Sequence, residues 1–401
     1  MSTLKVDAIR HNSATSDAIT TAADGTCTAK LTGMTGGGTF TNRNKIINGD
    51  FTIHQRGGTI TAGSGVYTID RWRSYRTGDS SGGYTVQQST SSYPQTNIAG
   101  VIDNFKASAL ITVTSAGSAA ANNNCKFQQR IEGSHVYDLA FGTAVAKKVT
   151  VSFYVKCSLT GNFGISLVNG GHNRSNVQLY TVNSADTWER KIVTFDGDTS
   201  GTWATNTGTG LQLMFDMGSG SSKHASSTGT WLSGEYHGTT SSVKLIHTNG
   251  ATMQYTGVQL EEGSVATSFE HRSISDELRR CQRYYIQYGG VNGDLSRFPM
   301  MGETPTTTVA QYVLQFPVAM RGGGDVTLTH NGTVSDYLIY TANASRTATD
   351  IQLAVTLKYG YGDVFGCRVN LSRSNGDLVA GRGVQGYSSN STGFLGFSRE
   401  L

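Results

Sequence analysis

The sequence predicts a mainly β protein, in which an antiparallel jelly-roll sandwich is followed by a short neck helix and a second small β-sandwich domain, with an extended N-terminal segment in front. Three observations favour this fold class. Apolar and polar residues alternate with period two over many stretches, which is typical of half-buried strands. Gly is frequent, at 50 of 401 residues, and charged residues make up 15% rather than the ~25% of ordinary globular chains. Apolar residues at helical spacing occur around residues 273–289 and are scarce elsewhere.

The N-terminal segment, residues 1–45, consists of short alternating stretches rich in Thr, Ala and Gly, such as LKVDAI and TCTAKLTG. It holds too few large apolar side chains to build a core of its own. We therefore expect an extended segment that is either disordered or dependent on a partner, which is another copy of the chain or a larger assembly.

Residues 46–272 contain about ten candidate strands, a number that suits one antiparallel sandwich or jelly roll. In KKVTVSFYVKC and LQLMFDMG the apolar side chains fall on one face of each strand. These residues are Val149, Val151, Phe153, Val155 and Cys157 in the first and Leu211, Leu213, Phe215 and Met217 in the second. The two faces predict the core of the sandwich, and Trp72 in IDRWRSY is expected to fill the same core.

The neck helix is predicted within residues 273–289, where Ser273 or Ser275 can cap a helix that begins with acidic residues. Its apolar residues, spaced by four, three and four positions, form a narrow stripe. They are Ile274, Leu278, Cys281 and Tyr285. Two interpretations stay open: the stripe packs on the adjacent sandwich, or it is the contact at which three parallel copies of the chain meet.

The last part, residues 290–401, alternates again and predicts a second β domain. Two of its links carry Asn-Gly, at Asn331-Gly332 and Asn375-Gly376. Asn-Gly between alternating runs predicts a tight hairpin, because a type I′ turn needs positive φ at both central residues.

Composition argues against several functional classes. The net charge is only +4, and no block of basic residues would follow phosphates, so we expect no nucleic-acid partner. The N-terminus lacks the apolar core of a signal peptide and no run of 18 apolar residues exists, so we expect a soluble product made in a cytoplasm. The five cysteines never form CxxC, and we expect free and mostly buried thiols.

A glycan-cleaving enzyme would need two carboxylates about 5–9.5 Å apart across the scissile bond. The visible pairs are Glu261 with Glu262, Asp196 with Asp198, and Asp276 with Glu277. Neighbours on a strand point to opposite faces, and such pairs more often lie in turns or helix starts, so we predict no catalytic residue. The nine histidines show no metal-binding spacing, and no metal ligand is predicted, although a structural calcium near Asp50 or Glu261 stays open.

Aromatic residues in loop-like sequence are the more promising feature, because sugar rings stack their apolar faces on Trp and Tyr. In the first domain the candidates are Trp203, Trp231 and Tyr236, which lie in stretches rich in Gly, Ser and Thr. In the last domain they are Tyr359, Tyr361 and Tyr387. For each, simple packing is the competing interpretation.

The stretch VQLEEGSVATSFEHRSISDELRRCQRYY, residues 258–285, resembles a junction found in tail fibre and receptor-binding proteins of tailed bacteriophages. There a carbohydrate-binding-module-like jelly roll ends and a distal domain begins. NRNKIINGDFTIHQRGG with YTIDRWRSY resembles the opening strands of that module, and FPVAMRGGGDVTLT with LGFSREL resembles its distal end. Together these stretches extend over most of residues 42–401.

The resemblance implies a homotrimer in the virion tail, made in the host cytoplasm and attached to other tail proteins through residues 1–45. Its C-terminus would lie farthest from the particle. Residues 290–401 would then bind a host cell-surface polysaccharide or an outer-membrane receptor. The alternative is a glycan-hydrolysing tail spike, or a binding module attached to a glycosidase.

Overall fold

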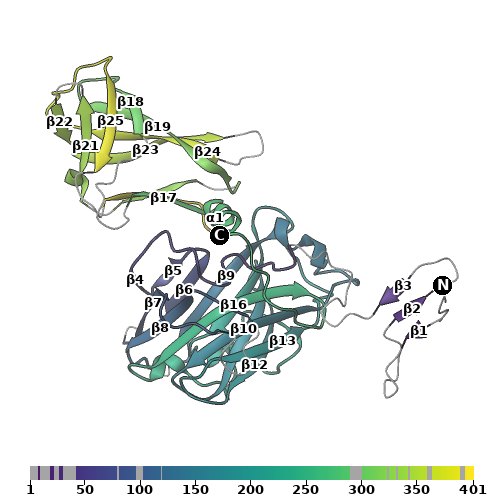
Figure 1. The fold of residues 1–401 in the computed structure, drawn as a ribbon. Coiled ribbons are helices and arrows are strands. Elements are labelled where there is room, and N and C mark those ends of the chain that lie inside the picture. Colours follow the sequence, from purple (N-terminus) through teal and green to yellow (C-terminus); the bar gives the residue numbers. More distant parts are fainter. Residues whose placement is uncertain are drawn as a thin grey trace.

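The computed structural model describes residues 42–78, 81–95, 103–118, 120–289, 300–322, 325–330, 333–341, 344–358, 364–388 and 393–401, together with three short strands near the N-terminus. Those strands are β1 (Ala8–Ile9), β2 (Ile19–Thr21) and β3 (Cys27–Ala29). They form an antiparallel sheet of their own (Figure 1). Within the described ranges no helix has the length and apolar character needed to cross a membrane.

The first domain is an antiparallel sandwich of two sheets, as predicted, with a jelly-roll-like arrangement (Figure 1). The six-stranded sheet has the order β13 (Glu189–Phe195), β10 (Val149–Cys157), β16 (Thr252–Glu262), β8 (Ser108–Ser115), β7 (Gly83–Ser89) and β4 (Thr59–Thr61). The seven-stranded sheet has the order β15 (Trp231–Ser233), β12 (Arg174–Val182), β11 (Gly161–Asn169), β14 (Thr209–Asp216), β9 (Asn124–Glu132), β6 (Trp72–Thr77) and β5 (Ser64–Ile69). Short 3₁₀ helices lie in its loops: η1 (Gly133–His135), η2 (Tyr137–Leu139), η3 (Ser221–Lys223) and η4 (Leu245–His247).

The core between these sheets is the one that the alternation predicts. All nine residues expected on the inner faces of β10 and β14 are buried in a single cluster with Trp72. Aromatic rings stack across it, with 5.0 Å between the centroids of Trp72 and Phe127. Cys125, Cys157, Cys281 and Cys367 are buried free thiols, as expected, whereas the side chain of Cys27 lies outside the described residues.

Parts of the outer faces of the two sheets of the first domain are buried as well, which the alternation does not predict. On the six-stranded sheet, Tyr154 packs with Phe105 and Trp188 in a separate apolar cluster. On the seven-stranded sheet, Gln212 and Asp216 point away from the core and are still 0% exposed. Long connecting segments therefore cover both faces, and buried polar groups collect beneath them.

The second domain is also a sandwich, in which a three-stranded and a seven-stranded sheet share one core (Figure 1). The smaller sheet has the order β17 (Tyr285–Gly289), β26 (Phe394–Ser398) and β20 (Thr327–His330). The larger has the order β22 (Ala344–Thr347), β21 (Tyr337–Thr341), β25 (Gly383–Ser388), β18 (Met300–Glu303), β19 (Val309–Met320), β24 (Val364–Ser372) and β23 (Asp350–Lys358). A 3₁₀ turn, η5 (Val334–Asp336), precedes β21.

The hairpin predicted at Asn375-Gly376 is wrong. This link joins β24 to β25, which lie in the same sheet but are separated by β18 and β19. Gly376 does take a positive φ of 63°, so the turn itself is present while the strands on either side pair elsewhere. The other predicted hairpin turn, Asn331-Gly332, lies outside the described residues.

The helix α1 (Ile274–Gln282) lies between the two domains, and the Oγ of Ser273 caps it by accepting a hydrogen bond from the backbone N–H of Asp276 at 3.2 Å (Figure 1). The neck is shorter than predicted, because β17 already belongs to the second domain. The apolar stripe packs inside the chain, where Leu278 and Cys281 join a cluster with Ile47, Ile53, Tyr284 and Leu401.

This packing corrects part of the predicted contact between chains. Cys281 is 0% and Tyr285 4% exposed, so neither has surface to offer another chain, whereas Ile274 is 70% exposed. Of the two open interpretations, packing on the adjacent sandwich therefore describes most of the stripe.

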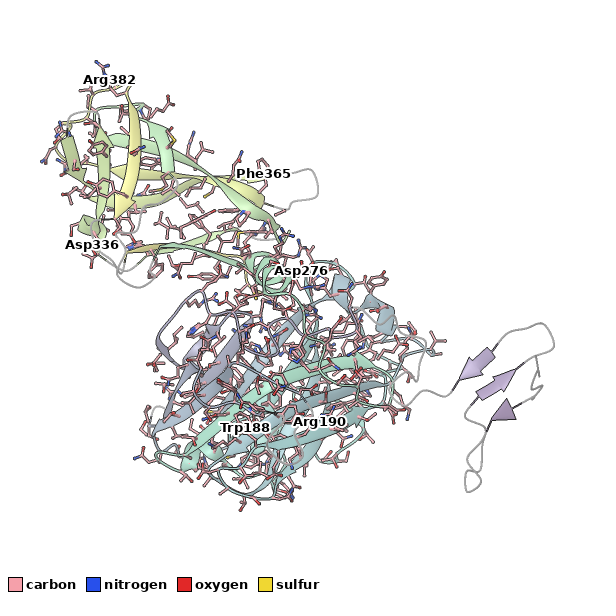
Figure 2. The ribbon with its side chains drawn as sticks, in the orientation of Figure 1. Trp188, Arg190, Asp276, Asp336, Phe365 and Arg382 are labelled. Atoms are coloured by element: carbon pink, nitrogen blue, oxygen red, sulfur yellow. The ribbon has the colours of Figure 1, made fainter. Side chains whose placement is uncertain are left out.

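The C-terminus does not lie at the far end of the molecule, contrary to the expectation from the family resemblance. It returns to α1 (Figure 1), where the hydroxyl of Tyr67 donates to the carbonyl of Leu401 at 2.6 Å. The backbone N–H of Arg399 donates to the carbonyl of Tyr284 at 2.8 Å. The tip of the second domain away from α1 is instead formed near Arg382 (Figure 2).

Candidate functional site

Three aromatic rings from separate segments meet on the first domain. Phe141 follows η2, Trp203 lies in the link between β13 and β14, and Trp231 begins β15. The ring centroids of Trp203 and Trp231 are 5.4 Å apart at an interplanar angle of 89°. Phe141 lies 4.9 Å from Trp203 and 5.8 Å from Trp231, edge-on to both. We call these three residues the aromatic cluster.

Backbone carbonyls hold both indoles of the aromatic cluster in place. The indole N–H of Trp203 donates to the carbonyl of Ser200 at 3.1 Å, and that of Trp231 donates to the carbonyl of Asp196 at 2.7 Å. Gly142 has a φ of 83°, and a Cβ there would lie 2.9 Å from Cδ1 of Trp203. The chain thus passes close to the indole at a position that suits Gly. Both N–H groups are thus satisfied, and all three rings are partly buried and pack against the core of the first domain.

An ion pair fixes the loop that carries Trp203. The guanidinium of Arg174 donates to both oxygens of Asp198, at 2.7 Å and 2.6 Å. Asp198 also accepts from the N–H and the hydroxyl of Ser200. A two-point contact of this kind sets direction as well as distance. The loop is therefore pre-organised, which limits the ordering cost when a ligand binds.

A shallow hollow lies beside the aromatic cluster, with a cavity volume of about 20 Å³, enough for about one water molecule. Its lining includes Phe141, Trp203, Val136 and Leu139. Tyr137, which the sequence reasoning missed, lines it too and is 65% exposed. Its position in the long connection between β9 and β10 was the only available signal, and many packed tyrosines share it.

The other predicted aromatic residues do not join this cluster. Tyr236 lies over the outer face of the seven-stranded sheet, where its backbone N–H donates to Oγ of Ser175 at 3.1 Å. Tyr387 belongs to the second domain, with its hydroxyl 2.5 Å from that of Ser345. Tyr359 and Tyr361 lie outside the described residues.

The three carboxylate pairs are all engaged by other groups. Glu261 accepts hydrogen bonds from Gln259 and Thr267, while Glu262 pairs with Lys147. Lys148 binds Asp196, as Arg174 binds Asp198. Ser273 contacts Asp276, and Arg272 pairs with Glu277.

These engagements bear on metal binding as well as on catalysis. Both oxygens of Glu261 accept hydrogen bonds from the protein, and Oδ1 of Asp50 accepts from Thr52. Among the described residues, no three His, Cys, Asp or Glu side chains gather as metal ligands would.

No protein-family model matches the chain, and no curated protein matches it either. Among solved structures, the enzymatically active domain of tailspike protein 4 from bacteriophage CBA120 is similar at 12% identity and a TM-score of 0.30, over 55% of this chain. The matched part spans only 22% of that tailspike chain. A family 11 carbohydrate-binding module from Clostridium thermocellum matches at 10% identity and a TM-score of 0.24, over 52% of this chain and 98% of its own. Likenesses this weak carry no weight for function.

Proposed function

We propose that the chain is a non-enzymatic tail fibre protein of a tailed bacteriophage, which binds a glycan of the host cell surface. It assembles as a homotrimer in the virion tail and attaches to other tail proteins through residues 1–45. The resemblance of residues 258–285 to tail fibre junctions supports this assignment. The observation that carries glycan binding is the convergence of Trp203, Trp231 and Phe141 from three segments.

The chemistry of the aromatic cluster fits a sugar. Pyranose rings have apolar C–H faces that stack on indoles, while their hydroxyls need polar partners nearby. The rings here are rigid, and Tyr137 adds a phenol with most of its surface open to solvent. A fixed amphipathic surface of this kind binds with little loss of side-chain entropy. Weak binding at each copy would still hold a particle through avidity.

We propose the primary site in the first domain rather than in residues 290–401. Two of the three first-domain candidates come together, whereas the ring of Tyr387 lies 6.3 Å from that of Tyr340, which is not a candidate. The distal domain is retained as a second contact with the host, either with polysaccharide or with an outer-membrane receptor. A glycan-hydrolysing tail spike is less well supported, because each candidate carboxylate already serves a structural contact.

Adsorption of purified protein to host cells, together with calorimetry on host surface polysaccharide, tests the proposal. Trp203→Ala and Trp231→Ala should each weaken polysaccharide binding at least tenfold. Trp188→Ala is the matched control, since Trp188 packs with Tyr154 elsewhere in the domain and should lower the melting temperature without changing affinity. Unchanged affinity in both cluster variants would overturn the site. Steady release of reducing ends from the polysaccharide would overturn the non-enzymatic assignment.

A further inference from the structure

The outer face of the seven-stranded sheet carries a row of side chains that cross four strands. Along β9, Lys126, Gln128 and Arg130 alternate with the core residues Phe127 and Ile131, so the first three point away from the core. In the sheet register Gln128 pairs with Arg73 on β6 and with Met214 on β14, and Met214 pairs with Ser166 on β11. These four residues therefore lie side by side across β6, β9, β14 and β11.

Several polar groups in this row have no hydrogen-bond partner within the protein. Gln128 is 0% exposed, and neither its amide nitrogen nor its amide oxygen is bonded. The hydroxyl of Ser166, which is also 0% exposed, has no hydrogen-bond partner either. Nε and Nη1 of Arg73 are buried and unpartnered too. Buried polar groups are almost always satisfied, and exceptions call for an explanation such as a ligand.

A short segment, residues 234–238, lies over this face after β15; we call it the strap. The backbone N–H of Tyr236 donates to Oγ of Ser175, and that of His237 donates to the carbonyl of Lys223 at 3.1 Å. The strap places the carboxylate of Glu235 against this face. It accepts from Nζ of Lys126 and from Nζ of Lys223, the latter at 2.8 Å.

The charges around Glu235 favour a negative group. Lys126, Lys223, Arg73 and Arg130 face this region, and the carboxylates that oppose them are Glu235 and Asp216, the latter paired with Lys126 in the register. His172 also lies 3.0 Å from Glu235 through Nδ1. Burial, with help from Lys126, lowers the pKa of His237 to about 4, so that ring is neutral at pH 7. If Glu235 moved aside, these two lysines and two arginines would be opposed by the carboxylate of Asp216 alone among the groups named here.

We propose that this face is a second binding site, for a glycan that bears carboxylates such as uronic acids, and that Glu235 on the strap occupies it until such a ligand displaces it. The proposal deepens the glycan-binding function and rests on it. The ligand's carboxylate takes the place of Glu235 between Lys126 and Lys223. Its hydroxyls meet the unpartnered amide of Gln128 and the hydroxyl of Ser166.

Calorimetry with a galacturonic acid oligomer and a neutral galactose oligomer of equal length tests the proposal on the full chain. Glu235→Gln keeps the size of the side chain but removes the competing charge, so affinity for the acidic oligomer should rise at least tenfold while that for the neutral one stays unchanged. Adding Gln128→Leu should cancel the gain. Glu262→Gln, which alters an exposed pair with Lys147, is the control. It should neither raise the affinity for the acidic oligomer nor cancel the gain of Glu235→Gln. No gain, or an equal gain for both oligomers, would overturn the site.

Hydrogen exchange on the unaltered protein gives a readout that does not depend on how the variants fold. The acidic oligomer should speed exchange at the amides of Tyr236 and His237, because displacement of the strap breaks their hydrogen bonds. Protected amides at saturating oligomer would contradict the displacement. Trp203→Ala separates the two proposals: it should weaken binding of host polysaccharide and leave the Glu235→Gln gain intact.

Discussion

The guanidinium carbon of Arg71 lies 3.5 Å from the centre of the Tyr284 ring, so that the first domain and the segment after α1 are joined by a stacked cation. The same guanidinium binds the carboxylate of Glu400, which lies next to Leu401. Arg71 is 1% exposed and has a φ of 69°, a region that side-chain-bearing residues seldom adopt. The stacking on Tyr284 and the ion pair with Glu400, which we together call the joint, hold Arg71 in this conformation. Loss of the Arg71 side chain should therefore weaken the contact between the domains.

Replacing Arg71 by Met should destabilise the protein by about 3 kcal/mol or more, because Glu400 would stay buried and, among the described residues, would keep Arg56, 3.2 Å away, as its ion-pair partner. Chemical denaturation of the full chain measures this loss. Lys148→Met is the matched control, since the Lys148 and Asp196 side chains are 61% and 62% exposed and such pairs contribute less than about 1 kcal/mol. Equal losses in the two variants would show that the joint is not stabilised by this pair.

Stability should fall between pH 7 and pH 5 in part because of His237. Burial lowers its pKa to about 4, while the unfolded chain titrates near 6.5. Between these values only the unfolded chain binds the proton, so acidification favours unfolding by about 1.4 kcal/mol per pH unit. Down to pH 5 this amounts to about 2 kcal/mol. In urea denaturation between pH 7 and pH 5, the free energy of unfolding of His237→Gln should fall by about 2 kcal/mol less than that of the parent protein. An identical fall in both proteins would contradict the assignment.

Tyr137→Ala should reduce affinity for host polysaccharide by about fivefold, since stacking on an aromatic ring contributes on the order of 1 kcal/mol. The side chain is 65% exposed, so the melting temperature should change little. Calorimetry and thermal denaturation on the same preparation separate the two effects. Ile192 on β13 is 51% exposed and belongs to neither proposed site, and Ile192→Ala serves as the control. Equal affinities for both variants would remove Tyr137 from the site.

Deleting residues 1–41 should leave the melting temperature unchanged and prevent incorporation into tails. The strands β1, β2 and β3 pair with one another and with no other described strand, so the two sandwiches do not depend on their pairing. Thermal denaturation checks the first expectation, and complementation of assembly with the shortened chain checks the second. Shortened protein that still assembles would refute the attachment role of residues 1–45.

The sequence predicted the sandwich cores well because alternation reports directly on which side of a strand is buried. It did not predict that Gln128 and Met214, on the opposite face, are buried too, since that depends on long segments that fold over the sheet. The joint was equally hidden, because Arg71 and Glu400 are 329 positions apart. Trp203 and Trp231 were identified by their loop-like surroundings, but their contact with Phe141 follows from the fold of three segments.

Domain boundaries show the same limit. A cut at residue 272, as alternation suggests, would remove α1 from the first domain and expose Ile47 and Ile53, which Cys281 and Tyr284 cover. The chain end crosses back as well, through the bond from Tyr67 to Leu401. Point variants in the full chain are therefore better tests of host binding than isolated fragments.

The helix stripe allows a direct test of the proposed trimer. Leu278 packs against the chain's own cluster, so Leu278→Asp should lower the free energy of unfolding by several kcal/mol whatever the number of chains, because a charge is forced into an apolar site. Ile274 is 70% exposed, so Ile274→Asp should leave a monomer's stability unchanged and weaken association only if this surface meets another chain. Light scattering at micromolar concentration gives the mass of each variant. A trimeric parent with a monomeric Ile274→Asp variant would place the contact at the start of α1. A monomeric parent would exclude the trimer, and a trimer unaffected by Ile274→Asp would move the contact elsewhere on the chain.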